Sequence, residues 1–262
     1  MIGSPSNPLS ISSLNSMALC NGLWILDDRG SSAAADTGTA LGRCVELWHR
    51  DGEPKDADPI VASVKLEAPV ASRPFTLARW EEVEKMFRGY YQDPRNAGVV
   101  ETWSLERPVR LELPAHESDS TQQPIHFLGH LDQVRRVGES LEVWDLKSGR
   151  ADGLDMVNNY AFQLALYTLA LATEYPRVRV GGIIRSRGYI CRGKPEPGQH
   201  NTHFCQPINL DVCRTLASRI AFMVARMRDR RVDLSPGSHC SFCAAGGLSS
   251  CIPRLRFQEY SV

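Results

Sequence analysis

Three short segments in the middle of the chain constrain its fold most strongly. They are a Gly-His-Leu-Asp run ending at Asp132, an Asp145-Leu-Lys147 run, and a Gln163-x-x-x-Tyr167 run. Alternate residues of a β-strand point to one face, so Asp145 and Lys147 share one side of a predicted strand. Helix residues four apart also share a face, so Gln163 and Tyr167 are expected to point toward the same place. The order therefore predicts a strand, a second strand and a helix around one polar site.

The flanking sequence predicts a mixed α/β fold. Apolar residues at helical spacing predict helices over residues 38–50, 77–91, 155–175 and 210–230. Alternating residues predict strands over residues 99–113, 127–137, 141–146 and 178–191. Pro108 indicates an edge or a bulge in the first strand. At the N-terminus, residues 1–9 are expected to be a flexible lead to a short helix over residues 10–25.

The three segments carry residue types that suit metal-dependent cleavage of a phosphodiester. Carboxylates such as Asp132 and Asp145 are hard oxygen ligands for Mg2+ or Mn2+. A metal there would polarise the scissile phosphate and activate a water, and Lys147 would offset the developing charge. The alternative is that all these residues are ordinary turn, strand and helix positions. Against it, Val143 and Trp144 surround the Asp-x-Lys pair with apolar bulk, where charges are costly unless paired or metal-bound.

The ordered set resembles the PD-(D/E)XK nuclease superfamily, and its Gln-x-x-x-Tyr helix is similar to that of RecB-type exonucleases. The resemblance runs from about Ser10 to Cys251. It implies a restriction-endonuclease-like α/β core, in which helices flank a central mixed sheet, and a metal-dependent DNA exonuclease activity with flap or endonuclease cleavage also compatible. The residues implied as catalytic are Asp132, Asp145, Lys147, Gln163 and Tyr167. The implied metal ligands are Asp132, Asp145, the carbonyl of Leu146, and Glu46 as the upstream acid.

One departure from the family pattern concerns its first motif, which often reads Gly-Thr-x-x-His. This chain has Gly38-Thr39-Ala40-Leu41 followed by Gly42, so the histidine is missing. His49, one turn beyond Glu46, is a candidate substitute, although a surface histidine is the expected reading, and Glu101 is a further candidate acid. The missing histidine keeps open a second function, that of a catalytically inactive DNA-binding or assembly subunit with the nuclease fold.

Eight cysteines in a chain expected to be cytoplasmic favour metal or cluster binding over disulfides. Cys240, Cys243 and Cys251 form a late group, and Cys20 lies near the other end. The resemblance to AddB-type and CRISPR-associated nucleases implies that these four hold a [4Fe-4S] cluster. Two alternatives remain. One is zinc bound by the late cysteines with His239 or Cys20, in an endonuclease that could act on RNA. The other is simple thiols in a tail.

The cluster would tie the chain ends together, which gives a three-part organisation. Residues 1–35 and 233–262 are expected to form an iron–sulfur lobe, and residues 36–232 the nuclease core. No run of about 18 apolar residues exists, so no membrane span is expected.

Charge distribution bears on the expected nucleic-acid partner. The net charge is zero, yet residues 1–176 hold 16 Lys+Arg against 25 Asp+Glu, whereas residues 177–231 hold 12 against 3. The second segment is expected to line a groove for a DNA strand, the alternative being a solvated basic helix. Because no Gly-x-x-x-x-Gly-Lys-Ser/Thr motif is present, unwinding would need a helicase or a recombination or CRISPR adaptation partner. An oligomer is compatible with the sequence.

Overall fold

The computed structural model describes residues 1–14, 33–67, 75–93, 96–98, 105–147, 153–176, 179–186, 203–204 and 209–229. Its helices are η1 (Ile11–Ser13), α3 (Ala33–Arg50), α4 (Asp58–Leu66), α5 (Leu77–Tyr91), α6 (Gly153–Glu174) and α7 (Leu210–Arg228). Its strands are β1 (Leu9–Ser10), β2 (Arg107–Leu113), β3 (Ile125–Leu131), β4 (Gln133–Val137), β5 (Ser140–Lys147), β6 (Arg179–Ser186) and β7 (His203–Phe204). The predicted mixed α/β class is confirmed.

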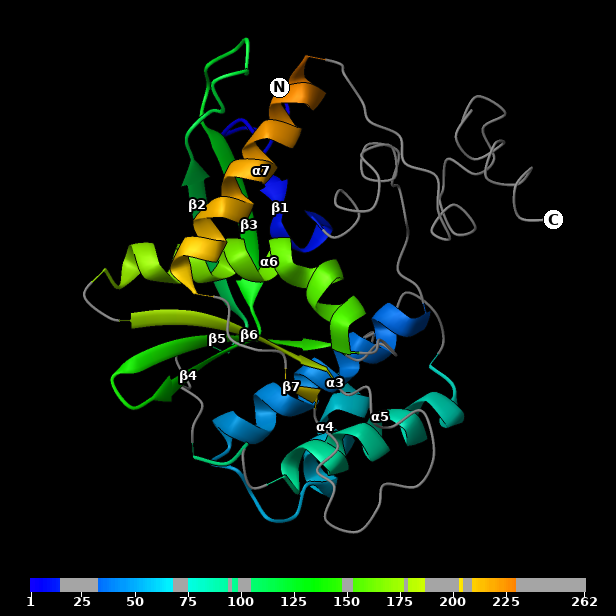
Figure 1. Cartoon of the computed structure of the whole chain (residues 1–262). Coiled ribbons are helices and arrows are strands. Elements are labelled where there is room, and N and C mark those ends of the chain that lie inside the picture. The colour runs from blue at the N-terminus through cyan, green and yellow to red at the C-terminus, as the bar shows by residue number, and fades with distance from the viewer. Residues whose placement is uncertain are drawn as a thin grey trace, which may run out of the picture.

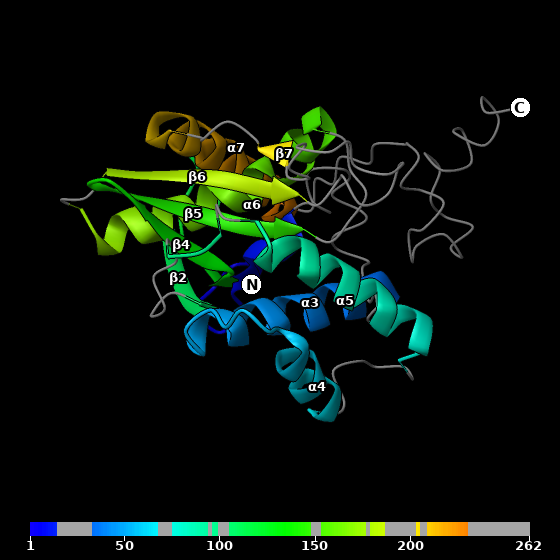
Figure 2. The same cartoon turned by 90° about the horizontal axis from the view of Figure 1, so that it is seen from below.

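The larger sheet has the strand order β4-β5-β6-β7 and contains both parallel and antiparallel pairs. Strands β4 and β5 form the predicted hairpin, whose turn contains Gly138 at φ 59°. Strand β6 pairs in parallel with β5, and the long helix α6 forms the connection that a parallel pair needs. Helix α6 covers one side of this sheet, and α3, α4 and α5 lie on the other side (Figures 1 and 2).

The smaller sheet has the order β1-β3-β2 and joins the larger one through a single residue, Asp132. Sequence alternation predicted one strand over residues 127–137, but the structure divides it into β3 and β4, which belong to different sheets. Strand β2 lies at the edge of the described sheet, as Pro108 indicated. Asp132 therefore lies at the junction between the two sheets and is not a mid-strand residue.

The N-terminal segment places apolar residues in the protein core, and its backbone pairs with β3. Leu9 pairs in parallel with Phe127 of β3 and is 4% exposed. Ile11 and Leu14 are completely buried, and the predicted helix is reduced to the short η1 over its described part. Burial of three large apolar side chains explains why this segment is ordered. Residues 9–14 therefore contribute to the main apolar core of the fold.

Two apolar cores hold the layers together. One lies between the two sheets, α6 and α7, and the other is formed by α3, α4 and α5. Side-chain caps begin two of the helices: Thr76 accepts the Arg79 amide before α5, and Asn209 accepts the Val212 amide at 2.9 Å before α7. None of the described helices is both long and apolar enough to span a membrane.

A buried ion pair joins the end of α7 to the loop after β2. Arg228 Nη1 lies 2.6 Å from Asp119 Oδ2, and both side chains are almost completely buried. Burial by itself raises the pKa of Asp119, but hydrogen bonds from Thr121 and Arg228 outweigh it, and the net pKa is lowered. Asp119 therefore binds its proton less readily in the folded chain than in the unfolded chain.

We expect this ion pair to make stability depend on pH on the acid side. Because the folded pKa is depressed, the contribution is complete above the ordinary Asp pKa of about 4 and is lost as pH falls through the folded value. Urea unfolding between about pH 6 and pH 2 should therefore show a steeper fall for the wild type than for Asp119→Asn, whose amide does not titrate. Parallel curves for the two proteins would contradict this account.

Candidate active site

Asp132 is fixed to the neighbouring strand by its side chain. Its Oδ2 accepts the backbone N–H of Leu146 at 2.6 Å, between Asp145 and Lys147 of β5. A short bond to a carboxylate is among the stronger hydrogen bonds. The break between β3 and β4 thus places the first acid directly against the strand that carries the second acid.

Asp145 is buried beneath this point, with 1% of its surface exposed. Gln163 Nε2 of α6 donates to Asp145 Oδ1 at 3.0 Å, and Gln163 is itself 3% exposed. Lys147 is the last residue of β5, two residues beyond Asp145, and its Cα pairs with Ser186 of β6. The Gln-x-x-x-Tyr helix therefore contacts the acid of the Asp-x-Lys strand.

Tyr167 lies one helical turn after Gln163 and belongs to the same group. Its ring is buried, and its pKa is raised, first by burial and then by the negative charges of Asp145 and Asp132. Hydrogen bonds with the Gln163 side chain and the His130 backbone partly oppose that rise. Tyr167 stays protonated at neutral pH and can donate a hydrogen bond within the site.

A glycine provides the space for the Tyr167 ring. A Cβ placed on Gly129 would lie 2.6 Å from Tyr167 Cε1 and 3.0 Å from its hydroxyl oxygen. Contacts this short force a rigid ring to move. The glycine of the Gly-His-Leu-Asp segment is thus explained by packing against the Gln-x-x-x-Tyr helix.

We expect Gly129→Ala to lower the free energy of unfolding by about 1–3 kcal/mol, the usual cost of overpacking a core. Gly42→Ala is the matched control, because its Cβ would meet Glu106 Oε1 at an ordinary 3.6 Å within a helix, where alanine is favoured. Urea unfolding should therefore show opposite signs for the two variants. A neutral Gly129→Ala would contradict the close approach of Tyr167.

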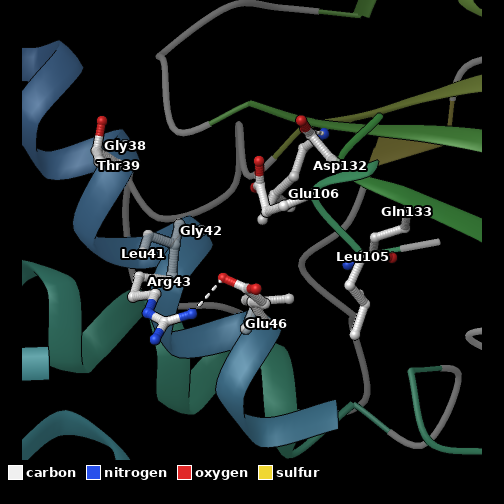
Figure 3. A pocket seen from close by; sticks show the side chains of 12 residues that line it. Gly38, Thr39, Leu41, Gly42, Arg43, Glu46, Leu105, Glu106, Asp132 and Gln133 are labelled. Atoms are coloured by element: carbon white, nitrogen blue, oxygen red, sulfur yellow. Dashed lines mark hydrogen bonds and ion pairs between the residues drawn. The ribbon is translucent and has the colours of Figure 1, made fainter. Parts of the chain in front are cut away.

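A pocket of about 430 Å³ opens beside these residues, between α3 and the ends of the strands. It is lined by Gly38, Thr39, Leu41, Gly42, Arg43, Val45, Glu46, Leu105, Glu106, Asp132, Gln133 and Leu146. Figure 3 shows that its three acidic side chains, Glu46, Glu106 and Asp132, come from different parts of the chain. The pocket is the natural entry to the group around Asp132 and Asp145.

Glu46 is close to this pocket, as the sequence suggested, but both of its oxygens are already engaged. Arg43 Nη1 contacts Oε2 at 2.7 Å, and Arg50 Nη2 contacts Oε1 at 2.7 Å. Glu46 is 7% exposed, so its charge needs such partners. Glu46 is thus held by two arginines, of which Arg43 lines the pocket.

Comparison with known families identifies the one to which the chain belongs. The model of the PD-(D/E)XK nuclease superfamily matches residues 8–248. This chain belongs to the PD-(D/E)XK nuclease superfamily. A solved structure from Eubacterium rectale, described as a "Putative exonuclease", superposes with a TM-score of 0.52 at 12% identity, covering 93% of this chain and 92% of that one. It shows a shared fold.

Two further comparisons add less. The solved structure of SSO0001 covers 90% of this chain and 96% of its own at 15% identity, but its TM-score of 0.35 is too low to show a common fold. No curated protein sequence significantly matches the chain.

For this nuclease-superfamily chain, His49 does not replace the missing histidine, and it is not a surface residue. It is 3% exposed, and its ring nitrogens contact Tyr90 Oη at 2.8 Å and Glu53 Oε1 at 2.9 Å. Burial is the main cause of its lowered pKa. His49 thus faces the core between α3 and α5, where Tyr90 binds it, and it does not line the pocket.

The expected basic groove is wrong for the described part of residues 177–231 that forms α7. Helix α7 packs against α6, on the far side of the larger sheet from α3, and contributes nothing to the pocket lining (Figure 2). Arg228 is buried in the ion pair with Asp119.

Some residues proposed from the sequence lie outside the described residues. They are Glu101 and the proposed cluster ligands Cys20, Cys240, Cys243 and Cys251.

Glu106 is the site residue that sequence reasoning missed. It ends the segment before β2, and its backbone N–H donates to the Asp132 carbonyl at 3.4 Å. Its pKa is raised by burial of the carboxylate and by the charge of Glu46, an effect that His130 and Arg50 partly oppose. No motif marks it in the sequence; only the pairing of β2 with β3 brings it beside Asp132.

Proposed function

We propose that this chain is a metal-dependent DNA exonuclease of the RecB type. The observation that carries the proposal is the 2.6 Å hydrogen bond from the Leu146 N–H to Asp132, which holds the first acid against the Asp145-x-Lys147 strand at the mouth of a pocket. Membership of a nuclease superfamily supports phosphodiester hydrolysis. DNA as substrate, and cleavage from ends, rest on the resemblance of the Gln163-x-x-x-Tyr167 helix.

The donor set suits Mg2+ or Mn2+. Within the described residues, no three carboxylate, imidazole or thiol groups are close enough to enclose a metal as they stand. Magnesium is usually bound by one or two carboxylates and keeps several waters, so an oxygen-only, partly open site is the appropriate type. Asp132, Asp145 and the Leu146 carbonyl would hold the ion, with Glu46 behind them.

The metal ion and the protein residues around it would then have different roles in the cleavage. A bound divalent cation supplies positive charge beside the scissile phosphate and makes water a stronger nucleophile. Lys147 would offset negative charge on the phosphate, and Gln163 would keep Asp145 oriented through their 3.0 Å bond. The protonated Tyr167 would position the DNA end or the lysine.

The cysteine site is a separate part of the proposal. Four thiolates from Cys20, Cys240, Cys243 and Cys251 are the donor set that a [4Fe-4S] cluster uses. We expect anaerobically purified protein to absorb visible light and to contain iron with acid-labile sulfide. Colourless protein that contains zinc would replace the cluster by a zinc site and leave the nuclease proposal intact. A helicase or an adaptation complex is the proposed kind of partner.

Substrate topology tests the exonuclease activity. End-labelled linear DNA, single- or double-stranded, should be degraded with Mn2+ or Mg2+, while covalently closed circular DNA of the same sequence stays intact. Nicking of the circle at a similar rate would make the protein an endonuclease. Tight DNA binding without any cleavage would identify the inactive subunit that the absent histidine also allows.

A further inference from the structure

The pocket contains a carboxylate to which the sequence motifs assign no role. Glu106 reaches it from the segment before β2, whereas Asp132 comes from the β3–β4 junction and Glu46 from α3 (Figure 3). Its backbone is anchored beside Asp132 by the hydrogen bond to the Asp132 carbonyl. Glu106 therefore has a fixed attachment next to an acid of the proposed metal site.

The Glu106 side chain faces a gap on α3. A Cβ built on Gly42 would lie 3.6 Å from Glu106 Oε1, and apart from its chain neighbours and the backbone of its own helix no other heavy atom of the described residues lies within 4 Å of that point. Gly42 stands where the related motif carries a histidine. A side chain at position 42 of α3 would occupy a space beside the pocket. The carboxylate of Glu106, from another element, lies next to that space.

The backbone of Glu106 is strained, as it also is at Glu53 and Gln122 elsewhere in the described residues. Its φ is 50°, in the left-handed region that glycine or asparagine adopts with less strain. Such outliers in non-glycine residues gather at functional sites. A glycine would serve the turn better, so the carboxylate is what glutamate adds at this position.

The charge partners of the two pocket glutamates also differ. Both Glu46 oxygens are held by Arg43 and Arg50. Within the described residues, the Glu106 carboxylate makes no hydrogen bond or ion pair, and its side chain lines the pocket. A side-chain rotation can therefore carry it toward Asp132 without breaking an existing bond.

We propose that Glu106 is a ligand of the divalent metal in this chain, replacing from the β2 side the histidine that is absent at Gly42. The proposal rests on the metal-dependent function inferred above. In the expected ligand set the additional acid was Glu46 of the helix. In the proposed set it is Glu106, which the pairing of β2 with β3 places beside Asp132. Glu46 then acts by holding Arg43 in the pocket wall.

Metal binding by the full-length chain tests the proposal without relying on activity. Protein freed of divalent ions on a chelating resin is titrated with Mn2+, and unbound Mn2+ is followed by its electron paramagnetic resonance signal. We expect Glu106→Gln to weaken Mn2+ binding by at least about 10-fold, since even residues that only touch metal ligands contribute 10–100-fold. Glu112→Gln, an exposed carboxylate further along β2, should bind like the wild type.

Two more variants separate a ligand from a structural residue. Glu106→Gly should weaken Mn2+ binding equally while leaving the urea midpoint unchanged or higher, because glycine relieves the positive φ. Gly42→His added to Glu106→Gln should recover much of the lost affinity. A double variant as weak as Glu106→Gln alone would contradict the shared role of the two positions.

The remaining outcomes distinguish this proposal from the function it rests on. Wild-type affinity in Glu106→Gln, with binding lost in Asp145→Asn, would overturn the Glu106 assignment and keep the metal-dependent nuclease. A wild-type protein that binds neither Mn2+ nor Mg2+ would overturn both.

Discussion

Asp145→Asn is expected to reduce DNA cleavage by more than about 100-fold while leaving the fold intact. The amide oxygen of asparagine can still accept the Gln163 Nε2 hydrogen bond, which is 3.0 Å long in the wild type. What the variant loses is the negative charge that would bind the cation. In metal-free protein the melting temperature should stay equal or rise, because a buried charge has been removed. Single-turnover cleavage of end-labelled DNA measures the effect.

The control for this variant is Glu139→Gln in the exposed turn of the same β4–β5 hairpin. It removes one carboxylate from the hairpin but lies away from the pocket, so cleavage should match the wild type. Adding Mn2+ should raise the melting temperature of the wild type and of Glu139→Gln, but not that of Asp145→Asn. Equal cleavage rates for Asp145→Asn and wild type would remove Asp145 from the site.

Arg228→Met is expected to lower the free energy of unfolding by about 3–5 kcal/mol, the usual effect of removing one partner of a buried ion pair. Methionine fills much of the volume but leaves the Asp119 charge buried without its 2.6 Å partner. The guanidinium also donates to four backbone carbonyls, those of Ile2, Gly3, Gln123 and Pro124. Arg228 thus connects α7, the N-terminal segment and the loop before β3.

Arg214→Met on the same helix is the matched control. Arg214 pairs with Asp211 at 2.9 Å, but both side chains are largely exposed, and such pairs contribute about 0–1 kcal/mol. Arg228→Lys should also destabilise, because an ammonium cannot reproduce the planar fork of donors. Urea unfolding measures all three. Arg228→Met within about 1 kcal/mol of the wild type would contradict this central role of the arginine.

The residues that the sequence located correctly are those governed by local periodicity. Strand alternation placed Asp145 and Lys147 together, and helical spacing placed Gln163 and Tyr167 one turn apart. The long helix and the hairpin follow from patterns within about twenty residues. Such patterns survive in the fold because each one buries a continuous apolar face.

The features that the sequence could not predict depend on contacts between distant segments. The break at Asp132 follows from its bond to Leu146, and burial of the first residues follows from pairing of β1 with β3. Glu106 joins the pocket only because β2 runs antiparallel to β3. Single-sequence periodicity contains no information on which strands become neighbours.

The distribution of charged residues along the sequence did not predict the role of Arg228, for a related reason. Arg228 belongs to a basic helix, which suggested a nucleic-acid surface, yet the fold uses its guanidinium internally against Asp119. A count of charges along a segment does not show which face of a helix is buried. The described part of that segment therefore contributes to stability at this position.

The central claim is that Asp132, Asp145 and Lys147 form one metal-dependent nuclease site. The most direct measurement is Mn2+-dependent cleavage of end-labelled DNA by anaerobically purified wild type beside Asp132→Asn and Lys147→Ala. The account predicts a product ladder from the wild type, which EDTA abolishes, and no products from either variant despite retained DNA binding. Cleavage by both variants at the wild-type rate, or DNA binding without cleavage by the wild type, would contradict it.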